Sequence, residues 1–205
     1  MPKEFAKKTG IHVVGAEKEH LQYAQQICQI IEEAAKERKT GIAKREPEYI
    51  EKKISEGKAV IALTESGKLA GFCYIESWGK NKDYIANSGL IVAPEFRELG
   101  LGKVIKKAAF ELSHQLFPNA KLFGITTNPA VMKINYKLGY RPVVFKQLTD
   151  DDEFWAGCKG CANYDILLRT NHHHCLCTAM LLDPAEKDEE KKKEMSNEEK
   201  SSVSV

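Results

Sequence analysis

The chain has 205 residues, which is enough for one well-buried domain with some length left over. Its apolar fraction of 42% and charged fraction of 29% are ordinary for a globular protein, and its net charge of +2 is too small to indicate a nucleic-acid-binding surface. The apolar runs are only as long as strands, and the first ten residues lack the apolar stretch of a signal peptide. These features predict a cytoplasmic protein that binds neither nucleic acid nor membrane.

Strand-like and helix-like segments alternate along the first three-quarters of the chain. In chain order, the predicted elements are a strand at 11–16, helices at 20–40 and 46–57, two strands joined by a turn within 58–77, a strand at 84–94, a helix at 101–116, a strand at 121–127, a helix at 129–139 and a strand at 140–148. An antiparallel hairpin followed by strand–helix–strand units predicts an α/β (α+β) fold with a sheet of mixed direction and a site where neighbouring strands part.

The last 22 residues differ from the rest in composition. Residues 184–205 are dense in both signs of charge and nearly free of core-forming side chains. Such a segment has no apolar face to pack, so we expect a solvated, disordered tail. The sequence therefore predicts one folded domain over residues 10–183.

Two glycines lie between the strand at 84–94 and the helix at 101–116. The stretch Arg-Glu-Leu-Gly-Leu-Gly, residues 97–102, lets the main chain approach a ligand closely at Gly100 and Gly102. The start of the following helix adds a partial positive charge, which favours an anion such as a pyrophosphate. A tight turn that needs glycine for steric reasons alone is the alternative. The glycine patterns of nucleotide-triphosphate and dinucleotide loops are absent.

The surroundings of this loop resemble a known family. The R-x-x-G-x-G pattern at 97–102, with Asn128 after a strand and the helix that ends in Tyr-Lys-Leu-Gly-Tyr, is similar to the acyl-CoA-binding motif of the GNAT family of N-acetyltransferases over roughly residues 11–150. The resemblance implies the GNAT fold: a mixed, mostly antiparallel sheet, splayed between its fourth and fifth strands and flanked by helices. It also implies acetyl-CoA or succinyl-CoA as co-substrate.

The same resemblance implies where CoA binds. The main chain of residues 98–103 would hold the pyrophosphate, and the strand edge at 90–92 would pair with the pantetheine arm, which Asn128 would contact from the other side. The implied CoA-binding residues are Leu90, Ile91, Val92, Arg97, Glu98, Leu99, Gly100, Leu101, Gly102, Lys103, Asn128 and Tyr136.

Acyl transfer from a thioester to an amine requires a stabilised carbonyl oxygen and a leaving thiolate that is protonated or solvated. A main-chain N–H near Leu90 or Ile91, freed by a bulge or splay in the strand, could polarise the carbonyl. The resemblance assigns Tyr136 as the acid that protonates the CoA sulfur. The alternative for Tyr136 is a helix residue packed on the sheet with its hydroxyl exposed.

The acceptor amine must also lose a proton. Glu76 is a candidate base because strand alternation places it on one face with Tyr74, and Ser88 with Asn87 could order a water molecule that relays the proton. The alternative for Glu76 is a solvated carboxylate near a strand end.

Residues 41–45, Gly-Ile-Ala-Lys-Arg, are similar to a glycine-to-arginine pattern of N-acetylglutamate synthase acyltransferase domains. Over its whole length the chain resembles small acyltransferases linked to arginine biosynthesis in Bacteroidetes. The resemblance implies that Arg45 holds the carboxylate of a small amine, plausibly L-glutamate, and that Lys44 assists. Solvated charges are the alternative for both residues. A non-catalytic acyl-CoA-binding regulator, a protein-lysine acyltransferase and a homodimer all stay open.

A cysteine-rich insertion at 154–177 follows the part of the chain that the resemblance covers. Its thiols occur in two close pairs, Cys158 with Cys161 and Cys175 with Cys177. Four thiolates suit a tetrahedral zinc ion, so a structural zinc site is one interpretation. Reduced thiols on a loop and on a last strand are the alternative.

Overall fold

Segments rich in β-branched and aromatic residues pair into a single sheet in the computed structural model, which describes residues 2–38 and 44–185. Within these residues the sheet has seven strands in the order β1-β2-β3-β4-β5-β7-β6. Their bounds are β1 Ile11–Gly15, β2 Ala59–Thr64, β3 Leu69–Trp78, β4 Tyr84–Val92, β5 Lys121–Thr126, β6 Arg141–Val143 and β7 Thr178–Leu182. Neighbouring strands are antiparallel except β4 and β5, which confirms the predicted mixed, mostly antiparallel sheet.

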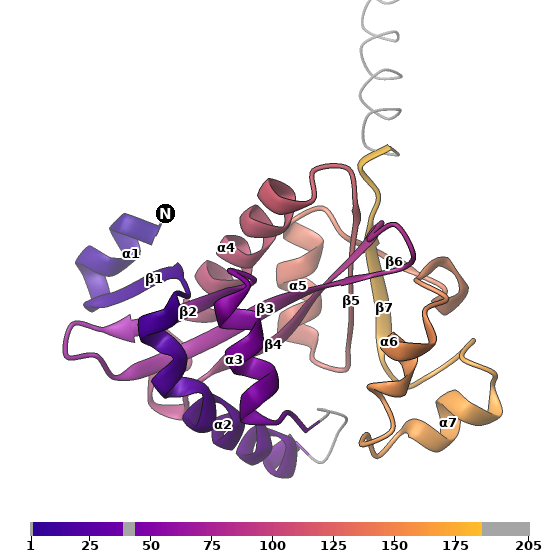
Figure 1. Cartoon of the computed structure of the whole chain (residues 1–205), viewed down its shortest axis with the longest axis horizontal. Helices are drawn as coiled ribbons and strands as arrows, with labels where there is room; N and C mark the ends of the chain where they lie inside the picture. The colour runs from indigo at the N-terminus through magenta and orange to yellow at the C-terminus, as the bar shows by residue number, and fades with distance from the viewer. Residues whose placement is uncertain (1, 39–43, 186–205) are drawn as a thin grey trace, which may run out of the picture.

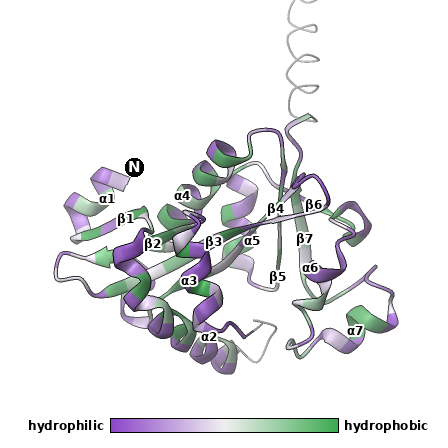
Figure 2. Cartoon of the chain, in the orientation of Figure 1, coloured by the Kyte–Doolittle hydropathy of each residue, from purple (hydrophilic) through white to green (hydrophobic). Residues whose placement is uncertain are grey.

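Helices cover both faces of this sheet (Figure 1). The α-helices are α1 Pro2–Thr9, α2 Ala24–Arg38, α3 Pro47–Ser55, α4 Leu101–Leu116, α5 Pro129–Lys137, α6 Asp152–Ala156 and α7 Tyr164–Arg169, and the 3-10 helices are η1 Lys18–Tyr23, η2 Pro94–Phe96 and η3 Phe145–Gln147. Helices α2 to α4 carry both hydrophobic and hydrophilic residues, as expected for helices with one buried face (Figure 2). None of the helices in the described ranges combines the length and the apolar character needed to cross a bilayer.

Strand alternation divides the core into two layers. In β3, Phe72 and Tyr74 face the apolar residues of α2 and α3, while Cys73 and Ile75 face those of α4. A third cluster covers the ends of β4, β5 and β7 and is built around Trp155 of α6. Helices α2 and α3 and the segment with α6 therefore cover different parts of the sheet.

Several elements differ from the prediction. Helix α1 precedes the first predicted element and packs Phe5 against the α4 side of the core. The strand predicted at 140–148 ends at Val143 and continues as η3. Strand β7 lies between β5 and β6, which makes β6 an edge strand of the sheet. Residues 144–177 form the long connection from β6 to β7. The predicted domain 10–183 and tail 184–205 stay predictions, and residues 186–205 lie outside the described part of the chain.

Strands β4 and β5 part after a short parallel pairing. The pairing extends only from Tyr84 opposite Lys121 to Ala86 opposite Phe123. Beyond it, Gly89 and Leu90 of β4 together oppose a single residue of β3, which is a β-bulge. Gly89 has φ +64°, and a Cβ there would lie 2.5 Å from the Tyr74 ring, so this position requires glycine. The predicted splay between the fourth and fifth strands is confirmed.

Candidate active site

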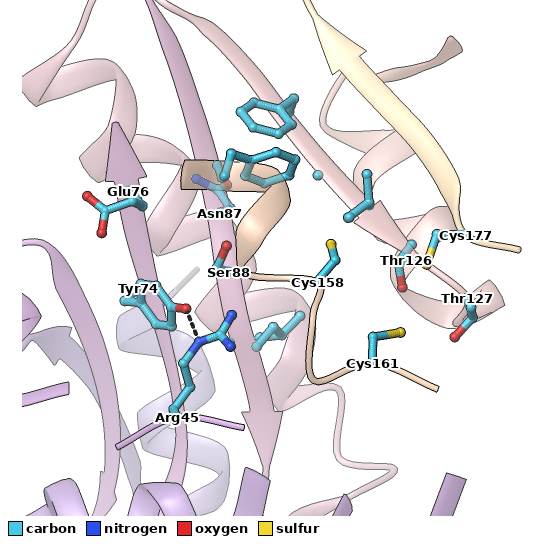
Figure 3. Close-up of a pocket in the computed structure, with 18 of the residues that line it drawn as sticks. Arg45, Tyr74, Glu76, Asn87, Ser88, Thr126, Thr127, Cys158, Cys161 and Cys177 are labelled. Atoms are coloured by element: carbon cyan, nitrogen blue, oxygen red, sulfur yellow. Dashed lines mark hydrogen bonds between the residues drawn. The ribbon is translucent and has the colours of Figure 1, made fainter. Parts of the chain in front are cut away.

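A cavity of about 540 Å³ opens where β4 and β5 part. Its floor is the stretch of β4 around the bulge, including Ser88, Gly89, Leu90 and Ile91. One wall comes from β3 and from the segment that leads into α3, and the other from residues 144–177 (Figure 3). The cavity thus fills the gap between the two helical covers of this face.

The wall on the β3 side carries two groups of hydrogen-bonded polar side chains, which meet where the Tyr49 and Tyr74 rings pack edge to face. The Nε of Arg45 donates to the Tyr74 hydroxyl at 2.6 Å, and the Tyr49 hydroxyl donates to Oε2 of Glu76 at 2.8 Å. Lys53, which is 3% exposed, forms an ion pair with the same carboxylate. Burial raises the pKa of Tyr49 and of Tyr74, so both hydroxyls keep their protons near neutral pH. Figure 3 shows the guanidinium of Arg45 pointing into the cavity.

The predicted acceptor and base residues divide between the cavity and the solvent. Arg45, Glu76 and Ser88 all line the cavity. Lys44 contributes to the lining as well, but it is exposed and its ammonium pairs with Glu46 at 2.9 Å. Residues 41–43 of the glycine-to-arginine pattern lie outside the described part of the chain.

Asn87, the predicted partner of Ser88 in a water relay, belongs to the cavity lining, but its amide is engaged on the other face of the sheet. The Asn87 amide donates to the Ser113 hydroxyl at 2.7 Å and its oxygen accepts from the Tyr140 hydroxyl at 3.0 Å. Because adjacent strand residues face opposite sides, this side chain serves the α4 layer while Ser88 faces the cavity. The structure therefore holds Asn87 in a packing role.

Residues 144–177 bring all four clustered thiols to the opposite wall. Burial raises the pKa of Cys158 to about 11 and of Cys177 to about 12, so both are protonated near neutral pH. Within the described ranges, no group of three or more Cys, His, Asp or Glu residues is arranged to hold a metal ion. The structure thus lends the predicted zinc site no support, because sequence spacing fixes neither the direction nor the convergence of the four side chains.

The glycine loop lies beyond the end of β4. Glu98 and Gly100 both have left-handed backbone angles, φ +66° and +82°, before α4 begins at Leu101. No group in the described part of the chain accepts a hydrogen bond from the main-chain N–H groups of residues 98–102. A Cβ on Gly102 would meet only Val92 of β4, at 3.7 Å. Five consecutive N–H donors and an open cradle at a helix start fit a pyrophosphate.

The other predicted residues of this loop do not extend into the cavity. One guanidinium nitrogen of Arg97 donates to both carboxylate oxygens of Glu37 in α2, at 3.2 and 2.9 Å, and Lys103 is exposed. Leu90 and Ile91 line the cavity, whereas Val92 and the loop lie beyond it. Strand β4 therefore leads directly from the cavity to the loop.

Helix α5 presents Asn128 to the cavity but not Tyr136. Asn128 lines the cavity and caps the helix by accepting from the N–H of Ala130 at 2.9 Å. Tyr136 is 57% exposed, lies under the guanidinium of Arg141 and does not line the cavity. The preceding residue, Asn135, is 1% exposed, and adjacent helix residues differ by about 100° in direction. This rotation directs Tyr136 away from the cavity, so the geometry lends no support to the acid role that the resemblance assigned to it, and that role stays a prediction.

Sequence reasoning missed the residues that bond to Arg45 and Glu76. Tyr49, Lys53 and Tyr74 come from α3 and β3, and each looks like an ordinary amphipathic or core position in the sequence. A usable signal was a tyrosine beside a glutamate on one strand face, combined with a lysine on the buried side of α3. Only the packing of α3 on β3 joins them.

Comparisons with known proteins agree with this geometry. The profile of the Acetyltransferase (GNAT) family matches residues 24–140, more than half of the chain. A search of curated proteins found no match. Among solved structures, N-acetylglutamate synthase from Neisseria gonorrhoeae with coenzyme A and N-acetyl-glutamate aligns with a TM-score of 0.58 and 16% identity, over 83% of this chain. This chain spans only 34% of that synthase.

Two smaller proteins align over most of their own length. A putative acetyltransferase from Salmonella typhimurium, yncA, with its cofactor acetyl-CoA, has a TM-score of 0.58 and 13% identity, covering 85% of this chain and 94% of its own. Diaminobutyrate acetyltransferase from Paenibacillus lautus, with L-2,4-diaminobutyric acid and coenzyme A, has a TM-score of 0.55 and 12% identity, covering 85% and 95%. At these identities the structures show a shared fold. Together with the profile match, which covers the splayed strands and the glycine loop, they show that this chain belongs to the GNAT acetyltransferase family.

Proposed function

We propose that this chain, an acyl-CoA-dependent N-acyltransferase by family, transfers an acetyl group to the amino group of a small amine that carries a carboxylate. The observation that carries the proposal is the orientation of the Arg45 guanidinium. Its guanidinium points into the cavity beside the bulge of β4 and is oriented by the buried Tyr74 hydroxyl. A planar guanidinium matches a carboxylate, and the donor would reach the same point along β4.

The donor's path runs along β4. In the proposal, N–H groups of residues 98–102 hold the CoA pyrophosphate, the unpaired edge at 90–92 binds the pantetheine arm, and Asn128 contacts it from α5. The bulge at Gly89 and Leu90 turns main-chain N–H groups out of the ladder, and one near Leu90 or Ile91 stabilises the developing negative charge on the carbonyl oxygen.

The chemical step itself needs few groups. The amine nitrogen attacks the thioester carbon, the carbon–sulfur bond breaks and CoA thiolate leaves. Glu76 is the proposed base: its Oε2 is engaged by Tyr49 and Lys53, while Oε1 accepts only from the Ser77 N–H, at 3.2 Å, among described groups and has a lone pair left for a water-relayed proton. Ser88 would order that water. Because Tyr136 does not line the cavity, the proposed proton source for the thiolate is water, and Tyr136 is the alternative that the resemblance gives.

L-glutamate and a role in arginine biosynthesis are the finer form of the proposal. They are supported by the similarity of residues 41–45 to the synthase pattern and by the shared fold of the N-acetylglutamate synthase structure. Succinyl-CoA is the alternative donor. A homodimer stays a prediction.

The test is release of free CoA thiol by the purified protein, with acetyl-CoA and succinyl-CoA against each proteinogenic amino acid, and mass spectrometry of the products. We expect N-acetylation of α-amino acids and at least tenfold less turnover of the matching α-amides. Tight CoA binding without turnover of any amine would instead favour the non-catalytic regulator.

A further inference from the structure

The two walls of the cavity differ in chemical character. The β3 side offers Arg45 and the hydroxyls of Tyr49 and Tyr74, whereas residues 144–177 and the adjoining strand ends offer mainly aromatic, aliphatic and thiol groups. The polar members of residues 144–177 in the lining are the Glu153 carboxylate, the Asn163 amide and the Tyr164 hydroxyl, none of them a cation. The members of this second wall that matter here are Phe123, Phe145, Phe154, Leu167, Cys161 and Cys177.

The charges that line the cavity are unevenly placed. Among the described lining residues, the cations are Lys44 and Arg45 and the acids are Glu46, Glu76 and Glu153. Lys44 pairs with Glu46 at 2.9 Å, and Glu76 pairs with buried Lys53. No cation of the described chain lies on the second wall, so Arg45 is the group around which a bound carboxylate would be placed.

The two walls would contact different parts of a bound amino acid, one its α-carboxylate and the other its side chain. With the α-carboxylate at Arg45 and the amine directed to the bulge, the side chain extends toward the second wall. An apolar side chain there gains about 25 cal/mol per Å² of buried surface and favourable contacts between sulfur and aromatic rings. A second carboxylate there would exchange its water for neutral donors such as the Asn163 amide, would gain no cation and would share the wall with the Glu153 carboxylate, which is unfavourable.

We propose that the β6–β7 connection, residues 144–177, makes this enzyme specific for α-amino acids with an aliphatic or aromatic side chain. The proposal rests on the broader proposed function, transfer to a small amine that carries a carboxylate, and it replaces the finer form of that function, because it ranks L-glutamate below an apolar amino acid of the same length. If the absence of a cation on the second wall sets the preference for apolar over acidic side chains, a positive charge placed on this wall should reduce that preference.

The experiment compares L-norleucine with L-glutamate, which have side chains of similar length, in the CoA-release assay with acetyl-CoA. We expect kcat/KM for L-norleucine to exceed that for L-glutamate by at least about 100-fold. The variant Cys161→Lys adds a cation to the second wall and should reduce this ratio by at least about tenfold. Leu168→Lys is the matched control: it adds the same charge to the same connection at a residue that is 59% exposed and outside the cavity, and it should leave the ratio unchanged.

The outcomes separate the two levels of the proposal. Faster turnover of L-glutamate than of L-norleucine would overturn the apolar preference while leaving the proposed function intact. An equal change in both lysine variants would show that the second wall does not contact the side chain. Thermal unfolding checks that Cys161→Lys is folded, and Cys161→Arg gives a second reading if it is not. If no amino acid is acetylated, the proposed function itself fails, and the preference fails with it.

Discussion

Removing the guanidinium of Arg45 should weaken acceptor binding without slowing the chemical step. Hydrogen bonds to charged groups contribute about 1.5–3 kcal/mol each, and a half-buried guanidinium can give two to a carboxylate. A loss of about 3–4 kcal/mol corresponds to a factor of roughly 100 to 1,000. Arg45→Ala should therefore raise the KM of a carboxylated acceptor by that factor and leave kcat within about threefold, because the lost binding is equal in the ground and transition states.

The neighbouring tyrosine gives a graded version of the same experiment. The 2.6 Å bond from Nε of Arg45 to the Tyr74 hydroxyl fixes the orientation of the fork. Tyr74→Phe keeps the ring in its packed position and removes only this bond, so it should raise the acceptor KM by about tenfold. Arg45→Lys, which keeps the charge but not the fork, should lie between the other two variants.

A change in the substrate decides whether the carboxylate is the partner of Arg45. With an acceptor whose α-carboxylate is replaced by an amide, Arg45→Ala should cost less than about threefold, because the partner group is already gone. Steady-state kinetics of both acceptors with wild-type and variant protein form a complete cycle. An equal loss on acid and amide, or an unchanged KM on the acid, would refute this account of Arg45.

Four further predictions test other parts of the structure. Gly102→Leu fills the open cradle at the start of α4, so the KM of acetyl-CoA should rise at least about tenfold with no change in thermal unfolding; an unchanged KM would remove the loop from CoA binding. Lys53→Met leaves the Glu76 carboxylate unpaired and should lower the free energy of unfolding by about 3–5 kcal/mol, which Lys53→Met combined with Glu76→Leu should largely restore in urea titrations. Burial lowers the pKa of Lys106 to about 8. Between pH 8 and 10.5 the unfolded chain therefore binds more protons than the folded one, and the free energy of unfolding should rise with pH by at most about 1.4 kcal/mol per pH unit. The variant Lys106→Met should abolish this rise. Tyr136→Phe should leave kcat within about twofold, and a tenfold fall would restore its role as an acid.

Local patterns in the sequence were enough to predict most of the elements of the fold. Periodic apolar residues and turn signals predicted the β-α-α-β-β-β-α-β-α-β order, because both depend on neighbouring residues. The glycine loop was also readable, since left-handed backbone angles favour glycine at position 100. The helices of the 144–177 connection and the place of β7 between β5 and β6 could not be predicted, because long-range packing decides them.

The candidate site shows the same division at the level of single residues. Arg45 could be proposed from sequence because its pattern is local. Adjacent helix residues differ in direction by about 100°, so an error of one position in matching a motif changes which residue faces inward. The motif alone could therefore not decide between Tyr136 and Asn135, of which the structure buries Asn135.

The sequence by itself determined the order of the main elements from β1 to β6, the glycine loop before α4 and the resemblance to GNAT acetyltransferases, all of which are properties of contiguous residues. Only the tertiary structure decided that Arg45 bonds to Tyr74 beside Glu76 with its partners Tyr49 and Lys53, and that the four thiols face this wall across a cavity. The physical reason is that these side chains come from segments far apart in the chain and converge because β4 and β5 part after Ala86.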